Sequence, residues 1–280
     1  NDYHPHLGSF IWAFFKEISI NKYEYSGRLF YLFFYLSGVF LISKNIFKFK
    51  IKNYILFIAI ILLTQKYIYF SGLQEILIFT SLVFISKFIY NFVKKDNFIS
   101  LFFISLSMNL LIWIKAEGLA YALICLIIIN LIPNLKIKKR LFINSLFLFM
   151  IIFKIIIYEI FQIKINDQPY YLNYILGLDF EILFYKIKNI VLYLSYYSFK
   201  NIILLAVPLL LIFNYKEIFK DNYIKLITFF FLLNMSFIFS AYIFREMDIE
   251  YALKTTIDRL IFSSSGFYLV FIINQIKKMK

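Results

Sequence analysis

Residues 75–95 read EILIFTSLVFISKFIYNFVKK, an apolar stretch with a glutamate at its start and two lysines at its end. The run from Glu75 to Val93 is close to the roughly 20 residues that a helix needs to cross a bilayer. Such a run must be helical, because lipid cannot satisfy unpaired backbone amides. Since apolar runs separated by short polar gaps recur almost end to end, the sequence predicts a polytopic membrane protein.

The composition supports a lipid environment. The 280 residues are 62% hydrophobic, whereas soluble domains are roughly 45–50% apolar. The net charge of +14 is a pattern that can also indicate nucleic-acid binding. Here the lysines lie in short gaps between apolar runs, so orientation in a bilayer explains them better and no nucleic-acid partner is expected. The single Cys125 excludes an intramolecular disulfide and is predicted to be a packing residue.

Nine apolar runs are candidate membrane spans. They are Gly27–Ser43, Tyr54–Phe70, Glu75–Val93, Phe98–Ile114, Gly118–Pro133, Leu141–Phe161, Asn201–Tyr215, Ile224–Phe244 and Leu260–Ile276. We therefore predict one all-α domain over residues 1–280, a polytopic transmembrane helical bundle of about nine spans. Segments 1–26, 162–200 and 245–259 are expected to be outer loops.

Basic residues fill alternate gaps between these runs. The five clusters are Lys44, Lys48, Lys50 and Lys52; Lys94 and Lys95; Lys136, Lys138, Lys139 and Arg140; Lys216, Lys220 and Lys225; and Lys277, Lys278 and Lys280. Alternation of nine spans puts all five on one side, which the positive-inside rule makes cytoplasmic. Of the 16 acidic residues, only Asp96, Glu217 and Asp221 accompany them. The opposite face is predicted to hold the chemistry.

Two outer segments are predicted to contain interfacial helices. The first contains the apolar run Phe10–Phe15, and the second contains FEILFYKIKNIVLYLSYYSF at residues 180–199. Tyrosines and lysines among apolar residues suit a helix at headgroup level; a tenth crossing there would break the charge alternation. Lys66, Lys87 and Lys154 lie inside apolar runs and are expected to extend their amino groups to headgroups.

Histidine and acidic residues gather near the N-terminus, in DYHPHLGS at residues 2–9. Asp2, His4 and His6 could bind a divalent metal ion or move a proton near neutral pH. Structural hydrogen bonding is the alternative.

Further ionisable candidates lie at the predicted outer mouths of spans. Glu75 either acts in chemistry or caps the start of its helix. Lys115 and Glu117 form a tight turn, WIKAEGL, where they pair locally or border a cavity. Arg259 could bind a phosphate through paired hydrogen-bond donors of its guanidinium group, or it could form an ion pair with its neighbour Asp258.

Taken in order, several motifs resemble the GT-C superfamily of multi-spanning glycosyltransferases. They are YHPHLGSFIWAFF at residues 3–15, EYSGRLFYLFFYL at 24–36, FSGLQEILIF at 70–79, WIKAEGLAY at 113–121 and LKTTIDRLIFSSSGFYL at 253–269. The first two are similar to the superfamily's first outer loop, the third to its second outer loop, the fourth to a Lys–x–Glu–Gly turn, and the last to a segment near the end of such proteins.

This resemblance implies transfer of a sugar from a polyprenyl-phosphate donor to a glycan, lipid or protein acceptor, on the periplasmic face of a bacterial inner membrane. It implies Glu75 and Asp2 as catalytic acids, and it suggests a divalent metal between His4 and Glu75. The substrate-contact candidates are His4, His6, Lys115, Glu117, Asp258 and Arg259. The superfamily's principal catalytic aspartate directly follows its first span, so we expect that span to precede Asn1.

Three other functions remain open from the sequence. A lipid-linked polysaccharide polymerase or ligase usually carries an arginine-rich outer loop, and arginines are few in the outer segments here. A transporter or flippase tends to have related halves and mid-span charges, which we do not find. A non-catalytic membrane subunit is the third.

Overall fold

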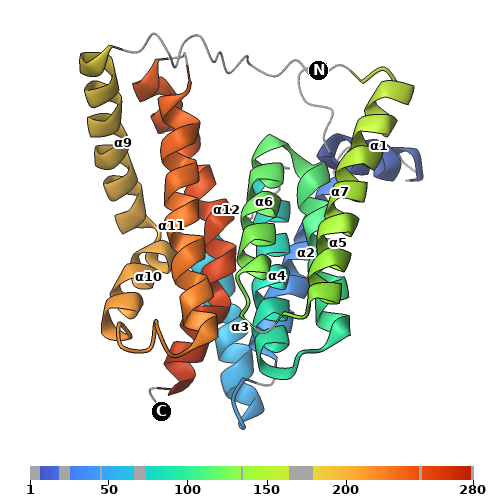
Figure 1. Cartoon of the computed structure of the whole chain (residues 1–280), viewed down its shortest axis with the longest axis vertical. Helices are drawn as coiled ribbons and strands as arrows, with labels where there is room; N and C mark the ends of the chain where they lie inside the picture. The colour runs from blue at the N-terminus through green and yellow to red at the C-terminus, as the bar shows by residue number, and fades with distance from the viewer. Residues whose placement is uncertain are drawn as a thin grey trace.

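The computed structural model describes residues 7–18, 26–44, 46–65, 74–133, 135–163, 179–245 and 248–278 (Figure 1). Helices make up 87% of these residues, and no strand occurs among them. The helices are α1 Leu7–Ile18, α2 Ser26–Ser43, α3 Lys50–Thr64, α4 Glu75–Lys95, α5 Phe98–Ile114, α6 Ala116–Asn130, α7 Ile137–Ile160, α9 Phe180–Lys200, α10 Ile202–Phe213, α11 Asn222–Ile243 and α12 Ile249–Lys278. The all-α prediction is confirmed.

Fewer helices than predicted are long enough to cross a bilayer. In the described parts of the chain, α4, α7, α11 and α12 meet the length and apolarity of a membrane span, and the bent pair α9–α10 adds a fifth. Helices α5 and α6 are apolar but have 17 and 15 residues, about 25 and 22 Å, against a hydrocarbon core of about 30 Å. The coarser prediction of a membrane protein is supported, whereas nine spans are not confirmed.

Helices α4 and α12 form the centre of the bundle. In the apolar stretch of α12, 78% of the residues are buried, against 17% in α7. The outer surface of α7 is apolar, with Phe149 and Ile155 exposed. An exposed apolar surface on a helix of this length suits contact with lipid.

A glycine sets the closest approach of the two central helices. A Cβ at Gly266 of α12 would collide with the carbonyl oxygen of Phe79 in α4. One turn earlier, Phe262 stacks on the Phe79 ring with centroids 4.8 Å apart. Small residues at helix interfaces allow such close backbone packing in membranes. This contact fixes the register of α4 against α12.

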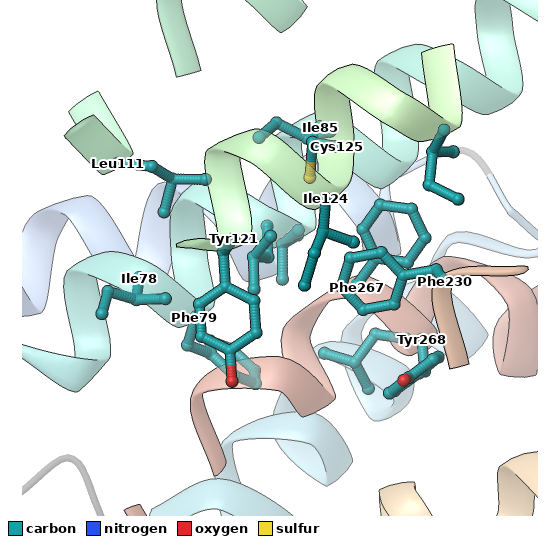
Figure 2. Packing of buried hydrophobic residues seen from close by; sticks show 14 of the residues in the cluster. Ile78, Phe79, Ile85, Leu111, Tyr121, Ile124, Cys125, Phe230, Phe267 and Tyr268 are labelled. Carbon is teal, nitrogen blue, oxygen red and sulfur yellow. The ribbon is translucent and has the colours of Figure 1, made fainter. Parts of the chain in front are cut away.

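Aromatic residues fill the space around this crossing. Phe230 of α11 stacks on Phe267 of α12 at 3.7 Å between centroids, and Figure 2 shows the two rings face to face. Tyr121 of α6 donates a hydrogen bond to the Leu260 carbonyl oxygen at 3.3 Å. Cys125 is free and buried in the same core, as predicted.

Two ion pairs lie at one end of the bundle. At the end that we call inner, Lys139 of α7 pairs with Asp96 after α4 at 2.6 Å, and Lys278 of α12 pairs with Glu217 at 2.9 Å. The opposite, outer end holds the first turns of α4 and α12, and α1 lies across it (Figure 1). The predicted separation of acidic from basic residues between the two faces stays a prediction, as does the end that faces the cytoplasm.

Residues 180–199, which were predicted to form an interfacial helix, form most of α9 and pack along the bundle; the place of α9 relative to the headgroups stays a prediction. Tyr185 near the start of α9 donates a hydrogen bond to Glu250 at the start of α12, at 3.0 Å. Asn201, just after α9, shares a small cavity with Ser265 in the middle of α12. Helix α9 therefore follows α12 for about 22 Å and runs beside α11 (Figure 1). At Asn201 the chain bends by 98° into α10.

Two lysines inside apolar helices bind backbone carbonyl groups at helix ends. Lys154 of α7 donates a hydrogen bond to the Ile112 oxygen of α5 at 2.7 Å, and Lys186 of α9 to the Arg245 oxygen after α11 at 2.7 Å. Carbonyl oxygens at helix C-termini carry partial negative charge, which explains both contacts. Lys154 therefore binds protein rather than headgroups, contrary to the prediction. Lys66 lies outside the described residues.

We expect Gly266→Ala to lower the free energy of unfolding by about 1–3 kcal/mol, because the added methyl meets the backbone of Phe79. Gly38→Ala is the control: its Cβ would lie 2.7 Å from a side-chain methyl of Thr80 rather than against a backbone atom, so the loss should be smaller. Unfolding in mixed micelles with increasing SDS measures both. Equal losses would contradict the assigned crossing.

Sidedness can be measured with single cysteines in a Cys125→Ser background. We expect Glu181→Cys, at the exposed start of α9, to react with an impermeant maleimide in intact cells, and Lys138→Cys to react only after permeabilisation. The reverse pattern would contradict the predicted orientation.

Candidate functional site

Four of the predicted site residues meet at the outer end of the bundle; we call Glu75, Lys115, Glu117 and Arg259 the outer cluster. Glu75 is the first residue of α4 and is buried, with 5% of its surface exposed. Its Oε1 accepts a hydrogen bond from Lys115 Nζ at 2.8 Å and lies 3.7 Å from Arg259 Nη1. A buried carboxylate needs such compensation, because desolvating an unpaired charge is costly.

The turn between α5 and α6 presents Lys115. It is the single non-helical residue between them and has an extended backbone. Gly118 makes this short connection possible, since a Cβ there would collide with the Leu111 carbonyl oxygen. Glu117 lies in the first turn of α6, where a carboxylate is favoured by the helix dipole. Its Oε1 is 3.5 Å from Lys115 Nζ.

Arg259 is held by its own helix and points one edge toward Glu75. Its Nε and Nη2 donate hydrogen bonds to the Thr255 carbonyl oxygen at 3.2 and 3.1 Å. The Arg259 and Glu117 side chains are 39% and 37% exposed, whereas that of Glu75 is 7% exposed. The cluster is therefore closed at Glu75 and more exposed at Arg259 and Glu117.

Asp258 is half-buried on α12, next to Arg259 in sequence. Its charge acts on the ammonium group of Lys200 at the end of α9. Its predicted role in substrate binding stays a prediction.

The predictions for Asp2, His4 and His6 lie outside the described residues. Within the described ranges, no group of three or more His, Cys, Asp or Glu side chains is arranged to hold a metal ion. The described ion-pair partners of Glu75 are two cations, Lys115 and Arg259. Neither can be a metal ligand, and their positive charges oppose the binding of a divalent ion. A metal between His4 and Glu75 therefore stays a prediction, and no chemical step below depends on it.

Sequence reasoning missed two residues beside the cluster. Thr255 orients Arg259 through its carbonyl oxygen, a role that no side-chain pattern signals. Gln74 precedes Glu75 and packs on α1: a Cβ at Gly8 would lie 2.7 Å from Gln74 Nε2. Its buried Oε1 has no hydrogen-bond partner in the part of the chain that the structure describes. The polar pair at residues 74–75 could have signalled it.

No family model, curated protein sequence or solved structure matches the chain.

We expect Lys115→Met to lower the free energy of unfolding by about 2–4 kcal/mol, because buried Glu75 would keep only the more distant Arg259. Adding Glu75→Gln should restore most of the loss. Lys254→Met is the control: it removes an ion pair with Glu250 in which both side chains are exposed, so its effect should be much smaller. Equal effects of Lys115→Met and Lys254→Met would contradict the assigned pairing.

Proposed function

We propose that the chain is a membrane glycosyltransferase of GT-C type, which transfers a sugar from a polyprenyl-phosphate donor to a glycan, lipid or protein acceptor. The proposed location is the bacterial inner membrane, with the site at its periplasmic face. The observation that carries the proposal is the outer cluster: one cation from the α5–α6 turn and one from α12 converge on one carboxylate, at the end of an apolar bundle.

The two cations suit a lipid-linked phosphate. During transfer, an acceptor hydroxyl attacks the anomeric carbon, the bond from that carbon to the phosphate oxygen breaks, and the polyprenyl phosphate leaves with the additional negative charge. Lys115 and Arg259 would stabilise this charge where it develops. The apolar helix surfaces would accommodate the polyprenyl chain.

The pairing of Glu75 favours a positioning role over that of a base. A buried carboxylate in contact with an ammonium group is stabilised as the anion and accepts a proton less readily. Glu75 would instead hold Lys115 and Arg259 in place. Glu117 is the more exposed carboxylate of the cluster and the better-placed acceptor for the proton of the attacking hydroxyl. Asp2 remains the second predicted catalytic acid.

Steady-state transfer from a labelled polyprenyl-phosphate sugar by the full-length protein in vesicles separates these roles. We expect Glu75→Gln and Arg259→Gln to raise the donor KM by about 10-fold or more, and Glu117→Gln to lower kcat. Glu250→Gln, an exposed glutamate at the start of α12, is the matched control and should leave both parameters unchanged.

An unchanged KM in Arg259→Gln would remove this residue from donor binding. A fall in kcat alone in Glu75→Gln would restore Glu75 as the base. If the intact lipid moves across the vesicle membrane and no polyprenyl phosphate is released, the protein is a flippase rather than a transferase.

A further inference from the structure

The inner end of the bundle contains a cavity of about 410 Å³ between the ends of α2, α4 and α12. Three ammonium groups and two amides line it: Lys44, Lys87, Lys277, Asn91 and Asn274. The lining also includes Leu41 and Ile46 but no acidic residue. We call this the lysine cavity. It lies at the opposite end of α4 and α12 from the outer cluster.

Positive charge is concentrated at the lysine cavity. A fourth lysine contacts Tyr90, which lines the cavity: Lys94 Nζ lies 4.3 Å, and Lys87 Nζ 5.8 Å, from the centroid of the Tyr90 ring. Lys44, Lys87 and Lys277 line one cavity, so their positive charges repel one another. Such like-charge contacts raise the free energy of the empty cavity.

The protein does not neutralise this charge with its described acidic residues. None of the ion pairs found within the described ranges includes Lys44, Lys87 or Lys277. Other lysines at the inner end do have carboxylate partners, as in the pair of Lys139 with Asp96. The lysine cavity thus brings together three cations of the inner end that have no described carboxylate partner.

Each lysine of the cavity could simply extend its ammonium group to the lipid headgroups, but this explains only some of them. Lys44 and Lys277 lie at helix ends, where such extension is normal. Lys87 is half-buried and lies eight residues before the end of α4, about 12 Å inside the bundle. One turn after it, Asn91 adds an amide to the same wall. Lys87 and Asn91 thus give the otherwise apolar helix α4 a polar surface on the side that lines the cavity.

We propose that the lysine cavity binds the phosphate of an anionic phospholipid from the adjacent leaflet. Ammonium and amide groups donate hydrogen bonds to phosphate oxygens, and the volume is in the usual range of ligand sites. Basic pockets between transmembrane helices on the cytoplasmic side are known to bind anionic headgroups. The apolar lining by Leu41 and Ile46, together with the exposed Phe40 on α2, favours a lipid over free phosphate. This proposal does not depend on the glycosyltransferase proposal.

Native mass spectrometry of the purified full-length protein tests it by titration with phosphatidylglycerol, phosphatidylcholine or inorganic phosphate. We expect phosphatidylglycerol to bind more tightly than the other two. Lys87→Gln should weaken its binding about fivefold, and Lys87→Gln with Lys277→Gln should weaken it further. Lys138→Gln, an exposed lysine of α7 at the same end, is the matched control and should have no effect.

Equal affinity for phosphatidylglycerol and phosphatidylcholine would overturn the proposal, as would equal losses in Lys87→Gln and Lys138→Gln. Tight binding of inorganic phosphate, with no preference for the phospholipid, would overturn the lipid assignment. Unfolding midpoints of the variants without lipid show whether each remains folded. Since Lys277 lies at the rim, Lys277→Gln alone gives a second test if Lys87→Gln does not fold.

Discussion

The close crossing of α4 and α12 at Gly266 is the contact on which the arrangement of both ends depends. The two helices run parallel, so the register fixed where Gly266 meets Phe79 extends in both directions. Toward the outer end it brings Arg259 to Glu75. Toward the inner end it places Asn274 and Lys277 beside Lys87 and Asn91. A residue without a side chain thus determines where the functional side chains meet.

The two ends differ in how their charges are compensated. In the outer cluster, Lys115 and Arg259 share the buried Glu75 carboxylate. In the lysine cavity, the lining cations have no described carboxylate partner. Phosphate chemistry suits both ends, but the outer cluster is built to hold its cations in fixed positions, whereas the lysine cavity has an excess of charge.

The sequence predicted local features well and long-range geometry poorly. Apolar runs and alternating charges predicted the helical class, and the WIKAEGL turn predicted that Lys115 and Glu117 lie together, because both signals are local. No local signal shows that Arg259 meets Glu75, since that contact depends on the α4–α12 register. No local signal in segment 180–199 shows that Lys186 binds carbonyl oxygens at the end of α11, which joins α9 to the bundle. The count of nine spans is not confirmed, because α5, α6 and α10 are shorter than a full crossing needs.

The central claim is that the α4–α12 register assembles a phosphate site from Lys115 and Arg259. A cryo-EM structure of the full-length protein with polyprenyl phosphate in lipid nanodiscs tests this claim most directly. We predict phosphate density in contact with both side chains, with Glu75 still paired to Lys115 and Gly266 still against Phe79. Phosphate bound away from Lys115 and Arg259, or Arg259 turned away from Glu75 in the complex, would contradict it.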